Sequence, residues 1–253
     1  MIKLKRIASL PILMIVGACF MTTPGFASGD DVELASAGID PDNINSLQRG
    51  AANFMNYCSG CHSARYVRYK TIGKNLGLSE ELLVDNLMFN AEKTLETIQA
   101  SMPADDAARW YGKAPPDLSL MARARGADRI YNFLKGFYVS EESPTGVDNL
   151  VLPGTSMPHV LWELQGYQTA HFVEHDVDGT PTITFEGFEQ VTAGTMDSED
   201  YDEFVRDTVN FLAYIAEPVR SFRVVLGKWV IMYLIFFLII ARMLKKQIWK
   251  DVK

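Results

Sequence analysis

The sequence predicts a mostly helical, exported domain with one small β-hairpin, attached to a membrane by a single C-terminal helix. Three observations lead to this prediction. Apolar residues recur with helical spacing in several segments, one segment alternates polar and apolar residues around a turn, and both ends of the chain carry apolar runs. With 253 residues, of which 48% are hydrophobic, the chain can bury one good core, so we expect one main domain with accessory segments.

The first 27 residues have the features of a secretory signal peptide. Basic residues between positions 3 and 6 precede an apolar run over residues 7–21, and the small residues Gly25 and Ala27 follow it. The run is short for a membrane span, which needs roughly 20 apolar residues. We therefore expect a signal peptide over residues 1–27 with cleavage after Ala27, and an uncleaved anchor is the alternative.

A helix is predicted to lead up to residue 62 and to carry the chain's most specific motif. Its buried face consists of residues at helical spacing, namely Leu47, Ala51, Phe54, Met55 and Cys58. The stretch "YCSGCHSARY", residues 57–66, places Cys58 and Cys61 three residues apart with His62 directly after them. This is the attachment signature of haem c, in which two thioethers hold the porphyrin and the histidine binds the iron.

Other uses of a Cys pair fit this stretch less well. A disulfide would not need the adjoining His62, and a thioredoxin-like redox pair expects a βαβ context that the sequence lacks. Half of a zinc site would need two further ligands, and the only other cysteine, Cys19, lies in the predicted signal peptide. The sequence therefore favours one covalently bound haem c.

Two helices are predicted between the cysteine motif and the middle of the chain. The first covers residues 79–99, where Ser79 is a suitable N-cap and two glutamates follow in the first turn. The second is expected in residues 128–138 and should end near Gly136.

A haem iron needs a sixth ligand or an open site, and the sequence offers several candidates. Methionine gives an electron carrier of raised potential, histidine a lower potential, and an empty position gives ligand binding or catalysis. Met157 is distinctive because it lies in "LPGTSMPH" between Pro153 and Pro158. The residues alone leave the choice open among Met88, Met102, Met121, Met157, Met196, His159, His171 and His175.

The last part of the soluble domain is predicted to contain a hairpin and a long helix. Residues 174–192 alternate around a turn at 179–181, which favours a small hairpin inserted after the Met157 loop. The segment 198–220 is expected to be helical and capped by Ser198. Its inward face should comprise Phe204, Val205, Thr208, Phe211, Leu212 and Ile215.

The C-terminus is predicted to cross a membrane once, over residues 223–242. The run "VVLGKWVIMYLIFFLIIA" contains a single charge, Lys228, near one end. No amphipathic stripe is visible in it, which disfavours a buried core helix. The basic tail over residues 243–253 should stay in the cytoplasm, so residues 28–222 are expected in the periplasm and the protein in the cell inner membrane.

The expected periplasmic domain is strongly acidic. Residues 28–222 hold 14 of the 24 Lys and Arg but 30 of the 31 Asp and Glu, which gives a formal charge of −16. Such a surface disfavours nucleic acid as a partner. A basic protein partner is compatible with it, and the alternative is that the acidic residues only keep the domain soluble.

Several motifs in order along the chain resemble the cytochrome c1 family. These are "RGAANFMNYCSGCHS", "APPDLSLMARARG", "SPTG", "LPGTSMP" and "AEPVR", followed by a single anchor with a basic tail. The resemblance covers nearly all of the mature sequence. It implies a cytochrome c-like haem domain with one covalent haem c, in which Met157 is the sixth iron ligand opposite His62.

The resemblance also implies residues that surround the haem. Arg125, the second arginine of Arg-Ala-Arg, corresponds to the family's partner of a haem propionate, and Tyr131 to a tyrosine near the haem. Pro115 and Pro116 correspond to a wall beside the porphyrin. The segment "MPHVLWELQG" departs from the longer Ala-Pro-Pro stretch of mitochondrial members, and the chain has no cysteines for the extra disulfide of some bacterial members.

The function implied by this resemblance is that of a membrane-anchored mono-haem electron carrier in the cytochrome bc1 complex. It should pass single electrons from the Rieske iron–sulfur subunit to a cytochrome c acceptor, beside cytochrome b in a dimeric complex. Quinol oxidation would belong to the assembled complex, because a carrier makes and breaks no bonds by itself. The alternatives are a c-type haem subunit of a terminal oxidase or other membrane-bound chain, and a haem enzyme with an open iron site.

Overall fold

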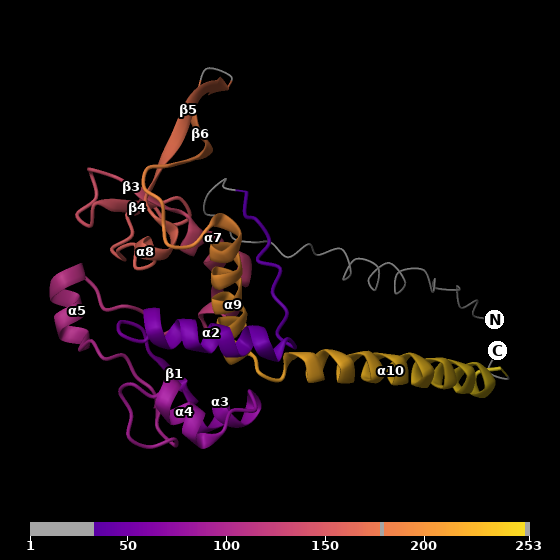
Figure 1. Ribbon diagram of the computed structural model, residues 1–253. Helices are drawn as coiled ribbons and strands as arrows, with labels where there is room; N and C mark the ends of the chain where they lie inside the picture. The colour runs from indigo at the N-terminus through magenta and orange to yellow at the C-terminus, as the bar shows by residue number, and fades with distance from the viewer. Residues whose placement is uncertain (1–32, 178–179, 251–253) are drawn as a thin grey trace. The chain divides into compact units, whose positions relative to one another are not determined.

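The computed structural model describes residues 33–177 and 180–250 and confirms a mostly helical protein (Figure 1). The helices are α2 (Ile44–Tyr57), α3 (Tyr69–Asn75), α4 (Glu80–Leu87), α5 (Ala104–Tyr111), α6 (Met121–Arg125), α7 (Ala127–Lys135), α8 (Trp162–Gln165), α9 (Ser198–Ala216) and α10 (Arg220–Ile248). The strands form three antiparallel pairs: β1 (Ala64–Arg68) with β2 (Thr97–Ile98), β3 (Phe137–Val139) with β4 (Val147–Asn149), and β5 (Gln168–Val177) with β6 (Thr180–Gln190). The predicted signal peptide lies outside the described residues.

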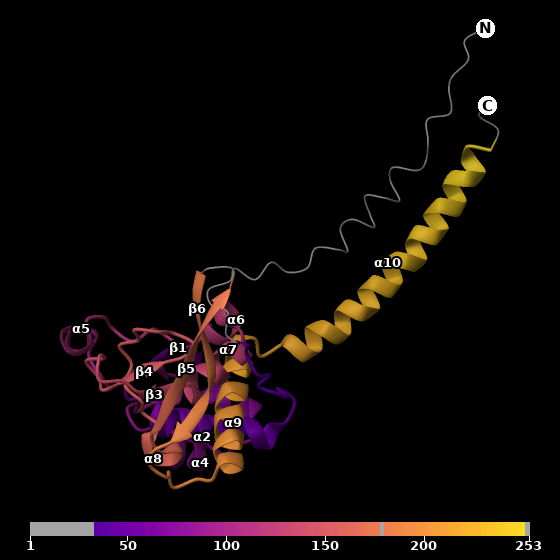
Figure 2. The same cartoon turned by 90° about the horizontal axis from the view of Figure 1, so that it is seen from above.

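Helices α2 and α9 pack directly against each other and form the centre of the domain (Figure 2). They approach closely at Gly50, where a Cβ atom would lie 2.0 Å from the backbone oxygen of Asp207. Next to this point the rings of Phe54 and Phe211 lie 5.8 Å apart. A residue without a side chain is therefore required at the crossing.

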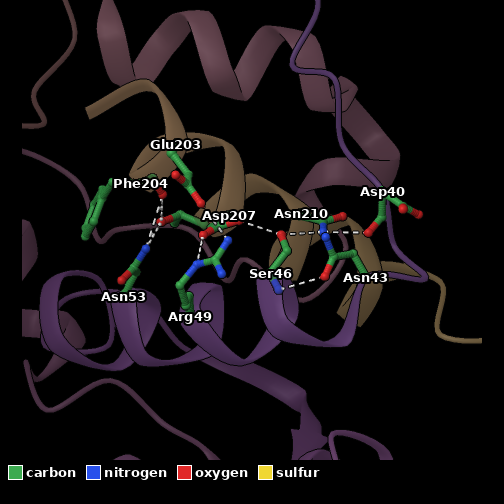
Figure 3. Close-up of polar contacts among 10 residues, drawn as sticks. Asp40, Asn43, Ser46, Arg49, Asn53, Glu203, Phe204, Asp207 and Asn210 are labelled. Atoms are coloured by element: carbon green, nitrogen blue, oxygen red, sulfur yellow. Dashed lines mark hydrogen bonds and ion pairs between the residues drawn. The ribbon is translucent and has the colours of Figure 1, made fainter. Parts of the chain in front are cut away.

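A cluster of polar side chains crosses the α2–α9 interface (Figure 3). The buried Asp207 carboxylate accepts a hydrogen bond from the Ser46 hydroxyl and pairs with Arg49 Nε, both at 2.5 Å. The Asn210 amide donates to Ser46 Oγ at 2.8 Å and to the backbone oxygen of Asp40 at 2.7 Å. These contacts provide the buried carboxylate with the partners that it needs in a region of low dielectric.

Two hydrophobic clusters flank α9, and both receive residues from it. The first cluster is Leu47, Ala51, Phe54, Met55, Ala64, Val67, Tyr69, Ile72, Leu76, Leu83, Leu87, Met88, Ile98, Ala122, Phe211, Leu212, Ile215 and Ala216. The second cluster is Ala37, Tyr131, Leu134, Leu161, Leu164, Tyr201, Val205 and Val209. The residues of α9 up to Val209 thus pack in the second cluster, and those from Phe211 onward pack in the first.

The helix that leads to the cysteine motif is shorter than predicted. It ends at Tyr57 rather than at residue 62, because the backbone N–H groups of Cys58 and Ser59 both donate to the Phe54 oxygen. The Ser59 hydroxyl also donates to the Met55 oxygen at 2.7 Å and so satisfies another carbonyl of the last turn. The prediction that this helix carries the cysteine motif as far as residue 62 is wrong, since Cys58 and Cys61 lie in the turn that follows it.

The predicted helix over residues 79–99 is also too long, because α4 ends at Leu87. Ser79 is confirmed as its N-cap, since its hydroxyl accepts a hydrogen bond from Leu82 N. Beyond Leu87 the backbone finds other partners: the Asn90 amide donates to the Gln99 oxygen, and Ile98 pairs with Ala64 of β1. Tertiary hydrogen bonds therefore replace the helix that local propensity favours.

The other predicted elements are present, with small shifts at their ends. Helix α7 ends at Lys135, directly before Gly136, as expected. The N-cap of α9 is Asp197 rather than Ser198, because the Asp197 carboxylate accepts hydrogen bonds from the N–H groups of Glu199 and Asp200. Of the predicted inward face, Phe204 is partly buried and the other five residues are buried.

The predicted hairpin is confirmed but is longer than the alternating segment suggested. It begins at Gln168, which pairs with Gln190, and contains an irregularity in register between His171 and Phe172. Residues 178–179 of the expected turn lie outside the described residues.

Helix α10 has the length and composition of a membrane span, and none of its described side chains is buried. It begins at Arg220, three residues before the predicted span, and continues to Ile248. Pro218 lies in the turn between α9 and α10, which Arg220 N closes by donating to the Glu217 oxygen. The described part of the chain thus contains one candidate anchor, at the predicted place.

Candidate haem site

The cysteine motif forms a tight turn between α2 and β1. The N–H groups of Cys61 and His62 both donate to the Cys58 oxygen, at 3.1 and 2.8 Å. Both cysteines are free thiols that are partly exposed, and Cys58 packs against the first cluster. Burial, with a smaller effect of Cys61, raises the pKa of Cys58 to about 12, and burial also raises the pKa of Cys61. A redox-active Cys pair needs a lowered thiol pKa, so this turn does not favour thioredoxin-like chemistry.

The orientation of His62 is fixed by a residue that lies 54 positions further along the chain. Its Nδ1 lies 2.8 Å from the backbone oxygen of Pro116. A carbonyl oxygen can only accept, so Nδ1 carries the proton and Nε2 presents its lone pair. Burial lowers the pKa of His62 against the opposing effects of Pro116 and Asp117, which favours the neutral imidazole that a metal requires.

The segment that contains Pro116 is attached to the motif by Asp117. Its Oδ2 accepts hydrogen bonds from Ser63 Oγ at 2.7 Å and from Arg65 N at 2.9 Å, and its Oδ1 accepts from Ser119 N. Burial opposes ionisation, but these donors together hold the pKa of Asp117 below its usual value. Asp117 was missed in the sequence, because nothing in "APPDLS" indicates that its carboxylate would contact residues 63–65.

Met157 and Tyr131, both predicted near the haem, lie together at the second cluster. Met157 is partly buried and packs against this cluster, of which Tyr131 is a buried member. The Tyr131 hydroxyl accepts a hydrogen bond from Lys135 Nζ at 3.2 Å. Cys58 and Met157 therefore contact different hydrophobic clusters, with Ile130 packed against both.

Three of the other ligand candidates are buried among other residues or paired with another side chain. Met88 is a buried member of the first cluster, and His171 pairs with Glu189 at 2.9 Å on the hairpin. His159 is buried and stacks on the ring of Phe137, with centroids 5.0 Å apart. Burial lowers the pKa of His159 to about 4, and neither of its ring nitrogens has a hydrogen-bond partner among the described residues.

The two arginines of the Arg-Ala-Arg segment have different surroundings. Arg123 pairs with Glu217 at 2.8 Å, at the end of α9. Arg125 is exposed and has no ion pair or side-chain hydrogen bond within residues 33–177 and 180–250. Nearby, Pro115 is partly buried and Pro116 is exposed. Arg125 is thus available to an anionic group in a way that Arg123 is not.

The donor groups in this region fit a haem c. Two unpaired thiols lie in one turn, and His62, directly after them, presents Nε2 as its lone-pair nitrogen. Met157 offers a partly buried thioether on the neighbouring cluster. A porphyrin needs thiol partners for its two vinyl groups and soft or imidazole ligands for its iron. Together with α10, these features define the class of membrane-anchored c-type haem proteins.

Comparison with known proteins identifies the family. The Cytochrome C1 family matches residues 39–252. A cytochrome c1 from Allochromatium vinosum is 45% identical over 227 residues, which cover 89% of this chain and 92% of that protein. The ammonia monooxygenase gamma subunit of Nitrosomonas europaea is 37% identical over 247 residues, 98% of this chain and 99% of that protein. The mitochondrial cytochrome c1 haem protein of Saccharomyces cerevisiae is 27% identical over 235 residues, 82% of this chain and 67% of that protein.

The chain belongs to the cytochrome c1 family, in its bacterial type. This confirms the predicted cofactor, since members of the family carry one covalently bound haem c. It also confirms the predicted function, that of a haem c electron carrier of the cytochrome bc1 complex. The apolar helix α10 is consistent with a membrane-anchored protein.

Proposed function

We propose that this chain holds haem c between its two hydrophobic clusters and passes single electrons from a Rieske iron–sulfur subunit to a cytochrome c. Cys58 and Cys61 would hold the haem covalently through two thioethers, and His62 Nε2 and the Met157 thioether would supply ligands to its iron. The observation that carries the proposal is the contact of His62 Nδ1 with the Pro116 oxygen, because it fixes the tautomer and leaves Nε2 for iron.

The remaining predicted residues are assigned to the surroundings of the porphyrin. Arg125 pairs with a propionate, since it is exposed and has no other anionic partner in the described part of the chain. Tyr131 is assigned to the neighbourhood of the haem, because it belongs to the cluster against which Met157 packs. Pro115 and Pro116 form a wall that holds the porphyrin edge and excludes water.

Bound haem c supplies an iron that gains and loses one electron. The residues of this chain determine how the haem is attached, how far water is excluded from it and what its reduction potential is. The turn at residues 58–62 holds two attachment points and a ligand within five residues, so the group is covalently fixed. The two clusters exclude water, and a thioether ligand favours the ferrous state and so a raised potential. The chain therefore serves as a carrier, while quinol oxidation takes place in the assembled complex.

The acceptor is proposed to be a basic cytochrome c. Residues 136–205 contain 14 Asp and Glu and no Lys or Arg. Many of these carboxylates are exposed, including Glu141, Glu142 and Glu163 after α7 and Glu186 on the hairpin. A surface of one sign attracts an oppositely charged partner at long range and raises the association rate.

The arrangement in the membrane follows from the charges around α10. We assign residues 1–27 to the signal peptide, 28–222 to a periplasmic haem domain, 223–242 to the span and 243–253 to the cytoplasm. The basic residues after Ala241 support this orientation in the inner membrane. Cytochrome b and the Rieske subunit are the proposed neighbours, in a dimeric complex.

Replacement of the proposed sulfur ligand tests the assignment. In Met157→Leu the haem should stay covalently attached, while its potential should fall by a few hundred millivolts, since axial ligands set haem potentials over roughly 0.8 V. The ferrous variant should also bind carbon monoxide, which the parent protein should not. Potentiometric titration measures the potential, and spectra of the reduced protein with and without carbon monoxide report the binding of the gas.

Met88→Leu is the matched control, because Met88 is buried in the first cluster and has no proposed contact with iron. Its potential should equal that of the parent protein. If Met157→Leu leaves the potential unchanged, Met157 is not the sixth ligand.

A further inference from the structure

A pocket lies where β1 and α3 meet the end of α9. Its volume is about 220 Å³. It is lined by residues of these elements and by the turn that leads to α10: Tyr66, Val67, Arg68, Thr71, Ile72, Tyr214, Ile215 and Pro218. Pockets that enclose a drug-sized ligand measure roughly 300–1,000 Å³. This pocket is therefore large enough for a small polar headgroup but not for a long apolar chain as well.

The residues that line the pocket supply apolar side chains, one cationic side chain and hydroxyl groups. Val67, Ile72 and Ile215 supply the apolar part and belong to the first cluster. Arg68 is exposed and has no carboxylate partner among the described residues. An uncommitted guanidinium beside hydroxyl groups is suited to a phosphate, to which it can donate two parallel hydrogen bonds.

The pocket lies at the membrane end of the domain. Pro218, one of its lining residues, precedes by six residues the apolar run that begins at Val224. Six residues span at most about 20 Å, and less when they are helical. The side chain of Asn75, at the end of α3, donates to Tyr214 Oη at 2.7 Å and so attaches α3 to the last turn of α9. The pocket is thus within reach of the lipid headgroups around α10.

The charge distribution of the domain points to an anionic ligand at this place. Residues 43–79 contain five Lys and Arg and no Asp or Glu, in a domain that carries −16 overall. Arg68, Lys70 and Lys74 of this segment are exposed. Directly after α9, Glu217 pairs with both Arg123 and Arg223, so these two arginines already have a carboxylate partner. Arg68, Lys70 and Lys74 therefore supply exposed positive charge at β1 and α3, next to Glu96 of the segment that pairs with them.

We propose that this pocket binds the phosphate headgroup of an anionic phospholipid from the leaflet that surrounds the start of α10. The acyl chains stay in the bilayer beside α10, while Arg68 and the neighbouring hydroxyl groups hold the phosphate. Exposed Lys70 and Lys74 add attraction to an anionic membrane surface. These basic residues hold the domain against the membrane. The acidic residues of the segment 136–205 then remain accessible to a soluble partner.

The test uses the full-length, haem-loaded protein in nanodiscs that contain phosphatidylglycerol, phosphatidylcholine or a mixture of both. Native mass spectrometry should detect phosphatidylglycerol retained on the protein in preference to phosphatidylcholine. In Arg68→Gln this retention should fall about tenfold, as expected for the loss of a charge-assisted hydrogen bond. Thr71→Trp, which fills the pocket and keeps every charge, should reduce retention as well.

Lys113→Gln is the matched control, since it removes one exposed positive charge outside the pocket. It should retain phosphatidylglycerol like the parent protein. The proposal is overturned if Arg68→Gln and Lys113→Gln retain the same amount of phosphatidylglycerol. It is also overturned if Thr71→Trp retains as much phosphatidylglycerol as the parent protein, or if inorganic phosphate displaces the lipid at low concentration. It is also overturned if a crosslinker on Thr71→Cys reaches another protein subunit instead of lipid. Haem content and potential should be unchanged in all variants, which separates this test from that of the proposed electron carrier.

Discussion

At the scale of single residues, the candidate site depends on contacts between segments that lie far apart in the sequence. His62 is oriented by the Pro116 oxygen, and the segment of Pro116 is held by the Asp117 carboxylate, which contacts Ser63 and Arg65. A metal-binding histidine commonly needs such a partner on its other ring nitrogen. Asp117 is therefore expected to stabilise the turn that carries the haem ligands.

This role of Asp117 predicts a pH-dependent loss of stability in Asp117→Asn. The pKa of Asp117 is lower in the folded protein than its ordinary value of 3.8. The ionised carboxylate therefore contributes fully to the free energy of unfolding above pH 3.8. This contribution is lost as the pH falls through the pKa of the folded state. At pH 7 the variant places an amide NH₂ against the N–H of Arg65 or Ser119 and should lose about 1–2 kcal/mol in free energy of unfolding. Below pH 3.8 the difference in free energy of unfolding between the variant and the parent protein should become smaller.

Urea titrations at pH 7 and at pH 3.5 measure this difference. Asp85→Asn is the control, because Asp85 is exposed on α4 and should give no change at either pH. A destabilisation of Asp117→Asn that is equal at both pH values would contradict the role assigned to the carboxylate.

At the scale of helices, the packing of α2 on α9 is the most extensive helix–helix contact among the described residues. Gly50 permits the approach, and the contacts of Asp207 with Ser46 and Arg49 fix the register of the two helices. The C-terminal half of α9 supports the first cluster, against which Cys58 packs. A disturbance of this crossing should therefore affect the whole domain.

Gly50→Ala is expected to destabilise the protein although alanine favours helix. Within a helix, alanine is more favourable than glycine by about 1 kcal/mol because of its higher helix propensity. The new Cβ would lie 2.0 Å from the Asp207 oxygen, and because that atom belongs to the backbone, a helix must shift. Overpacking of this kind costs about 1–3 kcal/mol or more, so the midpoint of urea unfolding should decrease.

Gly187→Ala serves as the control, because an added Cβ there meets no atom within 4 Å. Its unfolding midpoint should change little. An unchanged midpoint in Gly50→Ala would mean that the two helices are less closely packed than the structure indicates.

At the scale of the whole molecule, charge is unevenly distributed along the chain. Residues 43–79 carry only basic charges, residues 136–205 carry only acidic ones, and the tail after α10 is basic. The first region includes Arg68 of the pocket beside the anchor, whereas the second includes the exposed carboxylates proposed to attract an electron acceptor. The proposed topology places both regions on the periplasmic side of the membrane.

Protease accessibility tests this topology. Protease added to intact spheroplasts should digest residues 28–222, whereas a tag placed after Lys253 should remain protected until the membrane is permeabilised. Immunoblots against the haem domain and against the tag report the two sides separately. A protected haem domain with an accessible tag would reverse the assigned orientation.

The sequence by itself determined the features that depend on neighbouring residues. The motif of Cys58, Cys61 and His62 predicts haem c, the apolar run from Val224 predicts the anchor, and Ser79 marks the start of α4. Each of these signals comes from covalent spacing or local hydrogen bonding. Such signals do not depend on how distant segments pack.

Only the tertiary structure decided where helices end and which distant groups meet. It ends α4 at Leu87, where Ile98 pairs with β1 instead of continuing the helix, and it places the Pro116 oxygen against His62. It also shows that Cys58 and Met157 contact different clusters. These features are stabilised by contacts between residues separated by tens of positions, and local propensities of a few tenths of a kcal/mol per residue are too weak to oppose them.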